Sequence, residues 1–154
     1  MMKKTIEGVV ITPLKKIPDD RGKIMHIMKG TDPAFKNFGE VYCSTIYPGI
    51  VKGWHLHKEM TLNYAVIKGN IKFVLYDDRK DSPTYGVTQE VFMGDNQYVM
   101  VTVPPFVWNG FMCIGLEESF VINFTDIPHD SEEIIRMDPH SNDIIKYNWA
   151  IKDR

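Results

Sequence analysis

Two histidines that could do chemistry stand close together in one short stretch, Val51-Lys52-Gly53-Trp54-His55-Leu56-His57-Lys58. Side chains at positions i and i+2 of a strand point to the same face, so His55 and His57 are expected to lie side by side. Imidazole takes and returns a proton near neutral pH, and as a neutral ring it ligates metals. The pair therefore predicts a site for proton transfer or for metal binding.

A metal site needs more ligands than this pair provides. Zinc and similar ions take about three or four ligands from a protein, and His55 and His57 supply only two. Glu59 is a nearby carboxylate that could add another. We therefore expect no bound metal and no other cofactor, and Glu59 is the residue on which a metal site would depend.

A proton-transfer site needs a group that orients the imidazole and a neighbouring acid. Three tyrosines, Tyr42, Tyr47 and Tyr64, lie on predicted strands that flank the histidine stretch. The alternative is structural: His57 would face solvent, and His55 would be a hydrogen-bonded core residue. Two titratable rings on one face of a short β domain favour the catalytic interpretation.

Two cations stand where they could contact a phosphate. Arg21 lies in a turn that Gly22 closes, and Lys52 adjoins the histidines. Both side chains bind phosphate through charge-assisted hydrogen bonds. The aromatic residues Trp54, Trp108 and Phe111 could stack on a nucleobase, but a place in the core is the expected role of each.

Short strands separated by turns must position these residues. Besides the histidine stretch, strands are expected at residues 5–14, 23–29, 40–46, 60–67, 71–76, 88–92, 98–103, 111–114 and 119–124. Short helical turns are expected at residues 32–35 and 131–136, and a last short strand near Trp149. About ten strands with a turn signal roughly every ten residues predict an all-β sandwich or barrel.

Composition bounds the kind of protein. The 154 residues are 44% hydrophobic and 12% aromatic, which predicts one packed domain over residues 1–154. A net charge of −2 gives no reason to expect nucleic acid as a partner. No apolar run is long enough for a membrane span or a signal peptide, so a cytoplasmic protein is expected. Cys43 and Cys113 are too few for a disulfide scaffold and are expected to be buried free thiols.

The sequence resembles the dTDP-4-dehydrorhamnose 3,5-epimerase family over nearly its whole length. Lys52-Gly53-Trp54-His55 is similar to the family's Arg-Gly-Leu-His. A more specific likeness is Asp78-Arg79-Lys80-Asp81-Ser82-Pro83-Thr84-Tyr85-Gly86, which is similar to the family's Asp-Leu-Arg-x-x-Ser-Pro-Thr-Tyr-Gly. The resemblance implies a cupin-type double-stranded β-helix, or jelly-roll barrel, with short helical turns.

The resemblance also implies an activity on a dTDP-linked 4-keto-6-deoxy sugar by a homodimer without a cofactor. Its base maps to His55, which would remove a proton alpha to the C4 ketone, with His57 and Tyr42 as the other catalytic candidates. The positions of Arg21 and Lys52 imply contact with the nucleotide diphosphate. We assign Asn109 and Tyr64 to substrate binding as well, and we expect residues 5–12 to extend a sheet of the partner subunit.

Several positions depart from the family pattern. The family's lysine falls at Leu62, its tyrosine near Ile122 and the histidine of its His-Gly-Phe motif at Asn109, and its tail aspartate has only Asp153 as a counterpart. The histidine stretch instead resembles the Gly-Phe-His-Ala-His-Lys of the sugar 3,4-ketoisomerases, which are related cupins. Three functions stay open: a 3,5-epimerase-like enzyme, a 3,4-ketoisomerase, and a sugar-nucleotide-binding module that has lost the chemistry.

Overall fold

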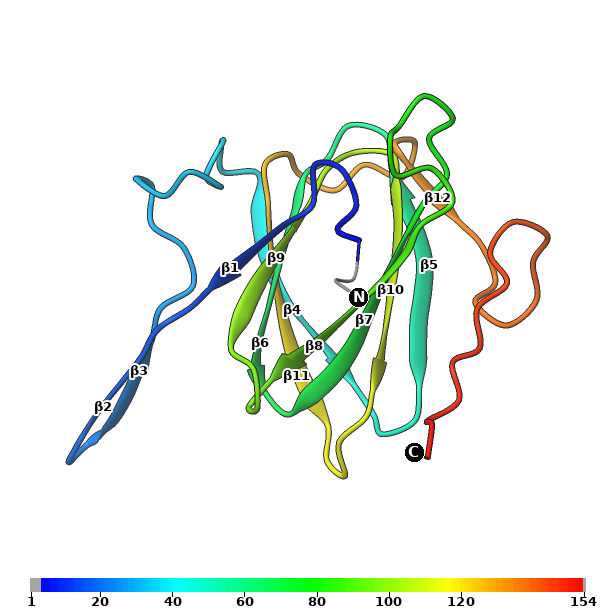
Figure 1. The fold of residues 1–154 in the computed structure, drawn as a ribbon. Coiled ribbons are helices and arrows are strands. Elements are labelled where there is room, and N and C mark those ends of the chain that lie inside the picture. Colours follow the sequence, from blue (N-terminus) through cyan, green and yellow to red (C-terminus); the bar gives the residue numbers. More distant parts are fainter. Residues whose placement is uncertain (1–3, 154) are drawn as a thin grey trace.

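Two five-stranded antiparallel sheets face each other in the computed structural model, which describes residues 4–153 (Figure 1). The first sheet has the order β1 (Val10–Pro13), β9 (Val99–Val103), β6 (Leu62–Lys68), β11 (Ser119–Thr125) and β4 (Glu40–Ile46). The second has the order β12 (Ile134–Arg136), β5 (Val51–His57), β10 (Val107–Cys113), β7 (Asn70–Asp77) and β8 (Thr88–Gly94). The all-β prediction is confirmed, and two facing antiparallel sheets are the arrangement of a jelly roll.

The main hydrophobic core lies between the two sheets, and a second apolar cluster covers the outer face of the second sheet. Side chains alternate between the two along β10, where Phe111 belongs to the main core and Trp108 to the outer cluster. In the outer cluster the rings of Trp54 and Trp149 lie with centroids 5.0 Å apart. The C-terminal segment thus covers β5 from outside, which leaves the inward face of β5 for other side chains.

A hairpin of β2 (Lys16–Asp19) and β3 (Gly22–Met25) projects from the body of the molecule as an arm (Figure 1). Two apolar side chains of the arm, Ile17 and Ile24, are 48% and 60% exposed. At the tip, the guanidinium of Arg21 pairs with the carboxylate of Asp19 at 2.6 Å, and the Arg21 side chain is 88% exposed. The arm therefore offers uncovered apolar surface and a cation away from the two main sheets.

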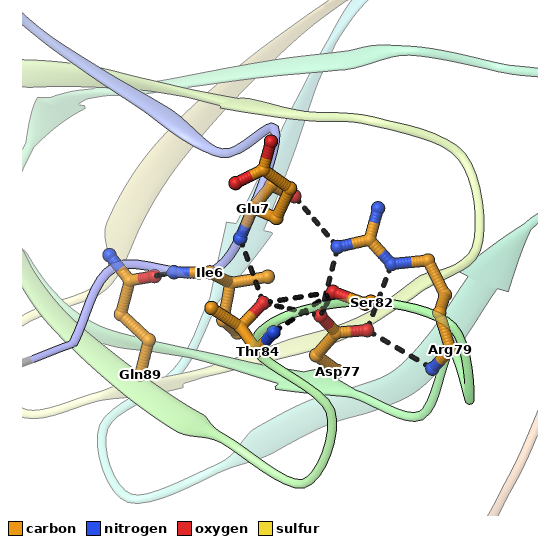
Figure 2. Close-up of polar contacts among 7 residues, drawn as sticks. All are labelled: Ile6, Glu7, Asp77, Arg79, Ser82, Thr84 and Gln89. Carbon is orange, nitrogen blue, oxygen red and sulfur yellow. Dashed lines mark hydrogen bonds and ion pairs between the residues drawn. The ribbon is translucent and has the colours of Figure 1, made fainter.

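Asp77, at the end of β7, shapes the loop that carries the Ser-Pro-Thr-Tyr-Gly motif (Figure 2). Its buried carboxylate accepts hydrogen bonds from the Arg79 guanidinium at 2.8 and 2.9 Å and from the hydroxyls of Ser82 and Thr84 at 2.6 Å each. Burial by itself would raise the pKa of Asp77, but these hydrogen bonds hold that pKa well below its ordinary value. The motif that carries the family resemblance is thus a structural motif here.

The same loop fastens the N-terminal segment to the body of the protein (Figure 2). The backbone N–H of Glu7 donates to the Thr84 hydroxyl at 2.9 Å, and Arg79 donates to the Glu7 carbonyl at 2.7 Å. The N–H of Ile6 donates to the side-chain oxygen of Gln89 at 2.8 Å, and Ile6 is buried in the main core. These bonds hold the segment that leads into β1 against the loop and the main core.

Three local expectations are wrong. No helix occurs among residues 4–153: residues 32–35 form turns, and residues 131–136 form a turn followed by β12. Residues 137–153 contain no strand, so the expected strand near Trp149 is absent. Cys113 is buried as predicted, but Cys43 is exposed. Nothing in this part of the chain forms a helix long and apolar enough to cross a membrane.

The N-terminal strand is shorter than expected, because β1 covers residues 10–13 and not 5–14. It pairs antiparallel with β9 of the same chain, and the extension of a partner's sheet by this segment stays a prediction. Pro13 is tolerated in β1 because β1 is the edge strand of the first sheet, where one side of the strand needs no ladder hydrogen bonds.

Candidate active site

A pocket of about 120 Å³ lies between the two sheets, with one wall from β4 and β6 and the other from β5, β10 and β12. It brings together five of the predicted catalytic and substrate-binding candidates: Tyr42, Lys52, His55, His57 and Tyr64. The rest of the lining is Glu40, Ser44, Met60, Phe111, His129, Ile134 and Arg136. Imidazoles, phenols and cations thus share one small space.

The alternation of β5 places both histidines in this pocket. His55 and His57 line it, whereas Trp54 and Leu56 belong to the apolar cluster on the outer face of the sheet. His57 is only 7% exposed, so the alternative in which it faces solvent is wrong. The i, i+2 spacing correctly predicts a shared face for the two imidazoles.

Glu133 is the carboxylate partner of the histidine pair, and it bonds to Nδ1 of His57. Its second oxygen accepts the backbone N–H groups of Glu59 and Met60 at 3.2 and 3.3 Å. Burial would raise the pKa of Glu133, but the bonds from His57 and from these N–H groups outweigh burial and lower that pKa. Glu133 is therefore a carboxylate at neutral pH, and because a carboxylate only accepts, Nδ1 of His57 carries the proton.

His55 has a different electrostatic environment. Burial, followed by the neighbouring Arg136, His57 and Lys52 in that order, lowers the pKa of His55 to about 4. Arg136 is the partner of His55 in the register between β12 and β5, which explains why its charge has this effect. His55 is thus a neutral imidazole at pH 7.

Two cations lie beside the imidazoles. Lys52 Nζ donates to the Ser44 hydroxyl at 2.9 Å and to the Thr45 carbonyl at 2.6 Å, which ties β5 to β4 at the pocket. Arg136 lines the pocket from β12. Both cations can pair with an anionic ligand that enters the pocket.

Tyr42 and Tyr64 stand on the wall formed by the first sheet. The side-chain amide of Asn123 donates to the Tyr42 hydroxyl at 2.9 Å, and Tyr64 lines the pocket beside Tyr42. Burial raises the pKa of Tyr64 well above its ordinary value, and the interaction with Tyr42 adds to this effect. The pocket accordingly has imidazoles on one wall and phenols on the other.

Two predicted substrate contacts lie outside the pocket. Arg21 sits at the tip of the arm, paired with Asp19, and does not line the pocket. Asn109 is fully buried, and its Nδ2 donates to the backbone carbonyl of His55 at 3.2 Å, so it supports β5 from β10. Tyr47, the third tyrosine considered as an acid, is 70% exposed and lies elsewhere on the surface.

Glu133 and Arg136 were not predicted from the sequence. Glu133 follows Ser131 and Glu132, where acidic residues already had a local explanation as the first turn of a helix. No signal in the sequence links Glu133 to His57, because 76 positions separate them and only the pairing of β12 with β5 brings them together. Arg136 became a pocket residue through the same pairing.

Among residues 4–153, no group of three or more His, Cys, Asp or Glu side chains is arranged to hold a metal ion. Glu59 contributes its backbone N–H to the site, through Glu133. Leu62, where the resemblance places the family's lysine, is buried in the main core. The absence of a metal cofactor remains a prediction.

A jelly roll with oriented imidazoles, phenols and cations in one pocket defines an enzyme-like cupin suited to proton transfer on an anionic ligand. The family model for dTDP-4-dehydrorhamnose 3,5-epimerase matches residues 3–154. The chain is 33% identical over 130 residues to a probable low-salt glycan biosynthesis epimerase of Haloferax volcanii, covering 83% of each chain. It is 29% identical over 150 residues to a spore coat polysaccharide biosynthesis protein of Bacillus subtilis, covering 97% of this chain and 99% of the relative.

A solved structure is also similar to this chain. The crystal structure of a dTDP sugar isomerase from Desulfovibrio desulfuricans is 39% identical, with a TM-score of 0.86 over 88% of this chain and 87% of that chain. The chain belongs to the dTDP-4-dehydrorhamnose 3,5-epimerase family. It is accordingly a cupin-type enzyme of the isomerase class, a sugar epimerase or isomerase.

Proposed function

We propose that this enzyme inverts a carbon next to the C4 ketone of a dTDP-linked 4-keto-6-deoxy sugar. Removal of the proton alpha to the ketone leaves an enediolate, and inversion requires the new proton to arrive at the opposite face. The observation that supports this most directly is the division of the pocket, with His55 and His57 on one wall and Tyr42 on the other. A base and an acid on facing walls suit inversion better than return of the proton to the same face.

Of the two histidines, we propose His57 as the base. Its Nδ1–H is held by the Glu133 carboxylate, which leaves Nε2 as the ring nitrogen that can accept a proton. The negative charge of Glu133 also stabilises the imidazolium that forms after proton transfer. Substrate approach from the pocket side is consistent with this role, because His57 lines the pocket and Glu133 lies behind it.

The base expected from the resemblance, His55, is better suited to binding. With a pKa of about 4, it remains neutral and is a weak proton acceptor at neutral pH. We propose that its neutral imidazole hydrogen-bonds a sugar oxygen beside the reacting carbon. Replacement by asparagine then lowers kcat less in His55→Asn than in His57→Asn, and the reverse order would return the base role to His55.

Lys52 and Arg136 are proposed to bind the diphosphate. A pocket of about 120 Å³ is small beside the roughly 300–1,000 Å³ of sites that enclose a whole ligand. We therefore propose that only the sugar enters the pocket and that the nucleotide lies along the mouth of the pocket, where these cations can reach its phosphates. Arg136→Gln is expected to raise KM about tenfold with little change in kcat, and an unchanged KM would contradict this role.

We also propose that the protein is a homodimer and that it is cytoplasmic. The arm supports the homodimer, because an isolated two-stranded hairpin is marginally stable in water and its apolar residues Ile17 and Ile24 are exposed. A groove of about 630 Å³ with a mainly apolar lining opens at the base of the arm. We propose that a second copy covers this surface, and light scattering that finds a monomer at micromolar concentration would exclude it.

In such a dimer, Arg21 reaches a substrate only from the partner subunit, since it lies outside the pocket of its own chain. Mixing Arg21→Ala with His57→Asn tests this idea. Hybrid dimers then hold one intact site, and activity recovers to about a quarter of the wild-type value. No recovery would place both residues in one site or remove Arg21 from substrate binding.

Product analysis tests the proposed function. A proton NMR time course with dTDP-4-keto-6-deoxyglucose is expected to show the C4 ketone retained and a neighbouring carbon inverted. The meeting of His55, His57 and Tyr42 in one pocket also fits the second candidate, a 3,4-ketoisomerase, and transfer of the ketone to C3 would favour it. Binding with no change to any such sugar would leave only the binding module.

A further inference from the structure

Three polar residues form a row across the inner face of the first sheet. Asn123 on β11 is directly opposite Tyr42 on β4 and opposite Tyr64 on β6 in the strand register. Residues opposite each other in an antiparallel pair point to the same face, so the three side chains converge. Tyr42 and Tyr64 line the pocket, and Asn123 is fully buried between them.

The amide of Asn123 can adopt only one orientation in this row. Its Oδ1 accepts the backbone N–H of Asn63 at 3.2 Å, so its Nδ2 must face Tyr42, to which it donates at 2.9 Å. A flipped amide would aim an N–H group at the N–H of Asn63. Asn63 is itself fixed by bonds to Thr102 at 2.7 Å and to the Phe124 carbonyl at 3.1 Å. Asn123 is therefore a permanent donor to the Tyr42 oxygen.

Tyr64 lies beside Tyr42 in the pocket lining, in register with Asn123, and is placed to act as a second donor to the Tyr42 oxygen. Its ring is buried and packs against Phe73 and Phe111, with centroid distances of 5.2 and 5.9 Å, so the hydroxyl has a fixed position. Burial raises the pKa of Tyr64, which keeps its proton in place. A phenol has one hydrogen to donate. Because Asn123 donates to the Tyr42 oxygen, Tyr42 keeps its own O–H free to donate into the pocket that it lines.

We propose that Asn123 and Tyr64 are positioning residues that aim the proton of Tyr42 at the enediolate and hold the phenolate that remains. This inference rests on the proposed function. In the step, the electron pair of the enediolate forms the new C–H bond with the Tyr42 proton, the C4 ketone is restored, and the negative charge moves to the Tyr42 oxygen. The two fixed donors then stabilise that charge until water returns the proton. Neither residue touches the substrate carbon in this scheme.

The test compares two rates measured in D₂O by NMR: inversion, and deuterium exchange without inversion. Removal of the base slows both rates equally, whereas a poorer acid slows inversion alone, because the enediolate then regains a deuteron from the base side. Tyr64→Phe keeps the ring and removes its hydroxyl donor. Asn123→Asp keeps an oxygen that accepts the N–H of Asn63 and removes the N–H group that donates to Tyr42. Each is expected to lower the ratio of inversion to exchange about tenfold or more.

Tyr98→Phe is the matched control, since it removes a tyrosine hydroxyl that bonds to the His26 carbonyl at 2.7 Å away from the pocket. Its ratio is expected to equal that of the wild type. A folded Tyr64→Phe protein, checked by circular dichroism, with an unchanged ratio would overturn the inference even if both rates fell. No exchange in the wild type would instead overturn the proposed function on which it rests.

Discussion

Replacement of Glu133 by glutamine tests the assignment of the base. The carboxylate accepts three N–H groups, from the His57 ring and from the backbone of Glu59 and Met60. A glutamine amide has only one oxygen. If that oxygen stays with the backbone N–H groups, the NH₂ group faces Nδ1 of His57, which must then give up its proton. The ring proton moves to Nε2, and the atom that should accept the substrate proton is blocked.

The size of the effect follows from this change of tautomer. Leaving a buried donor unpaired costs about 1–3 kcal/mol, or roughly 5- to 150-fold in rate. In hydrolytic triads, the same change from carboxylate to amide costs about 10⁴ in kcat, because the histidine takes the wrong tautomer. We therefore expect Glu133→Gln to lower kcat by about 10²- to 10⁴-fold. KM should change less than about threefold, because Glu133 does not line the pocket.

The assay is steady-state kinetics with the 4-keto sugar, together with a thermal melt to establish that the variant is folded. Glu132→Gln is the control, since it makes the same chemical change at the exposed neighbouring position. A folded Glu133→Gln enzyme with wild-type kcat would refute the role of His57 as a base oriented by Glu133. A raised KM at wild-type kcat would do so as well, since it would make Glu133 a binding residue.

Three further predictions concern stability and metal content. Because the pKa of Asp77 is lower in the folded protein than its unfolded value near 3.8, the ionised carboxylate stabilises the fold above that pH, and this stabilisation is lost as the pH falls below it. At pH 7, Asp77→Asn is expected to lower the free energy of unfolding in urea by about 2–4 kcal/mol, whereas the control Asp78→Asn should stay near wild type. The pKa of His55 is depressed from 6.5 to about 4, so as the pH falls the unfolded chain takes up a proton before the folded protein does. The free energy of unfolding therefore falls by up to about 3 kcal/mol between pH 6.5 and pH 4. A His55→Gln protein that kept this acid dependence would contradict the assignment. Elemental analysis should find no stoichiometric zinc, iron or manganese, and one metal per chain that disappears in His55→Ala would show the opposite.

The sequence was most informative where the relevant contacts are local. Alternation along β5 placed His55 and His57 on one face, and the strand 40–46 was predicted with its observed bounds as β4. Turn residues between apolar runs located the hairpins, since glycine and asparagine favour the backbone angles that such turns need. These features depend on neighbouring residues, and so they can be read from the chain alone.

The rest of the site depends on contacts between distant residues. Asn123 and Tyr42 are 81 positions apart and meet only because β11 pairs with β4. The segment 131–136 has the acidic start of a helix, yet its residues 134–136 pair with β5 as β12, because the tertiary position offers ladder hydrogen bonds that outweigh a weak local preference. Arg21 could be placed in a turn, but the direction in which the arm leaves the body could not be predicted.

The most direct test of the central claim is the position and stereochemistry of deuterium in a dTDP-4-keto-6-deoxy sugar incubated with the enzyme in D₂O. If a base on one wall and an acid on the other invert the substrate, NMR will show deuterium at a carbon next to the C4 ketone, with that carbon inverted. The His57→Asn protein will bind the same sugar and incorporate deuterium at least a hundredfold more slowly, in line with the usual contribution of about 10²- to 10⁴-fold from a positioned base. Deuterium that enters only with retention of configuration, or at the wild-type rate in His57→Asn, would contradict the account.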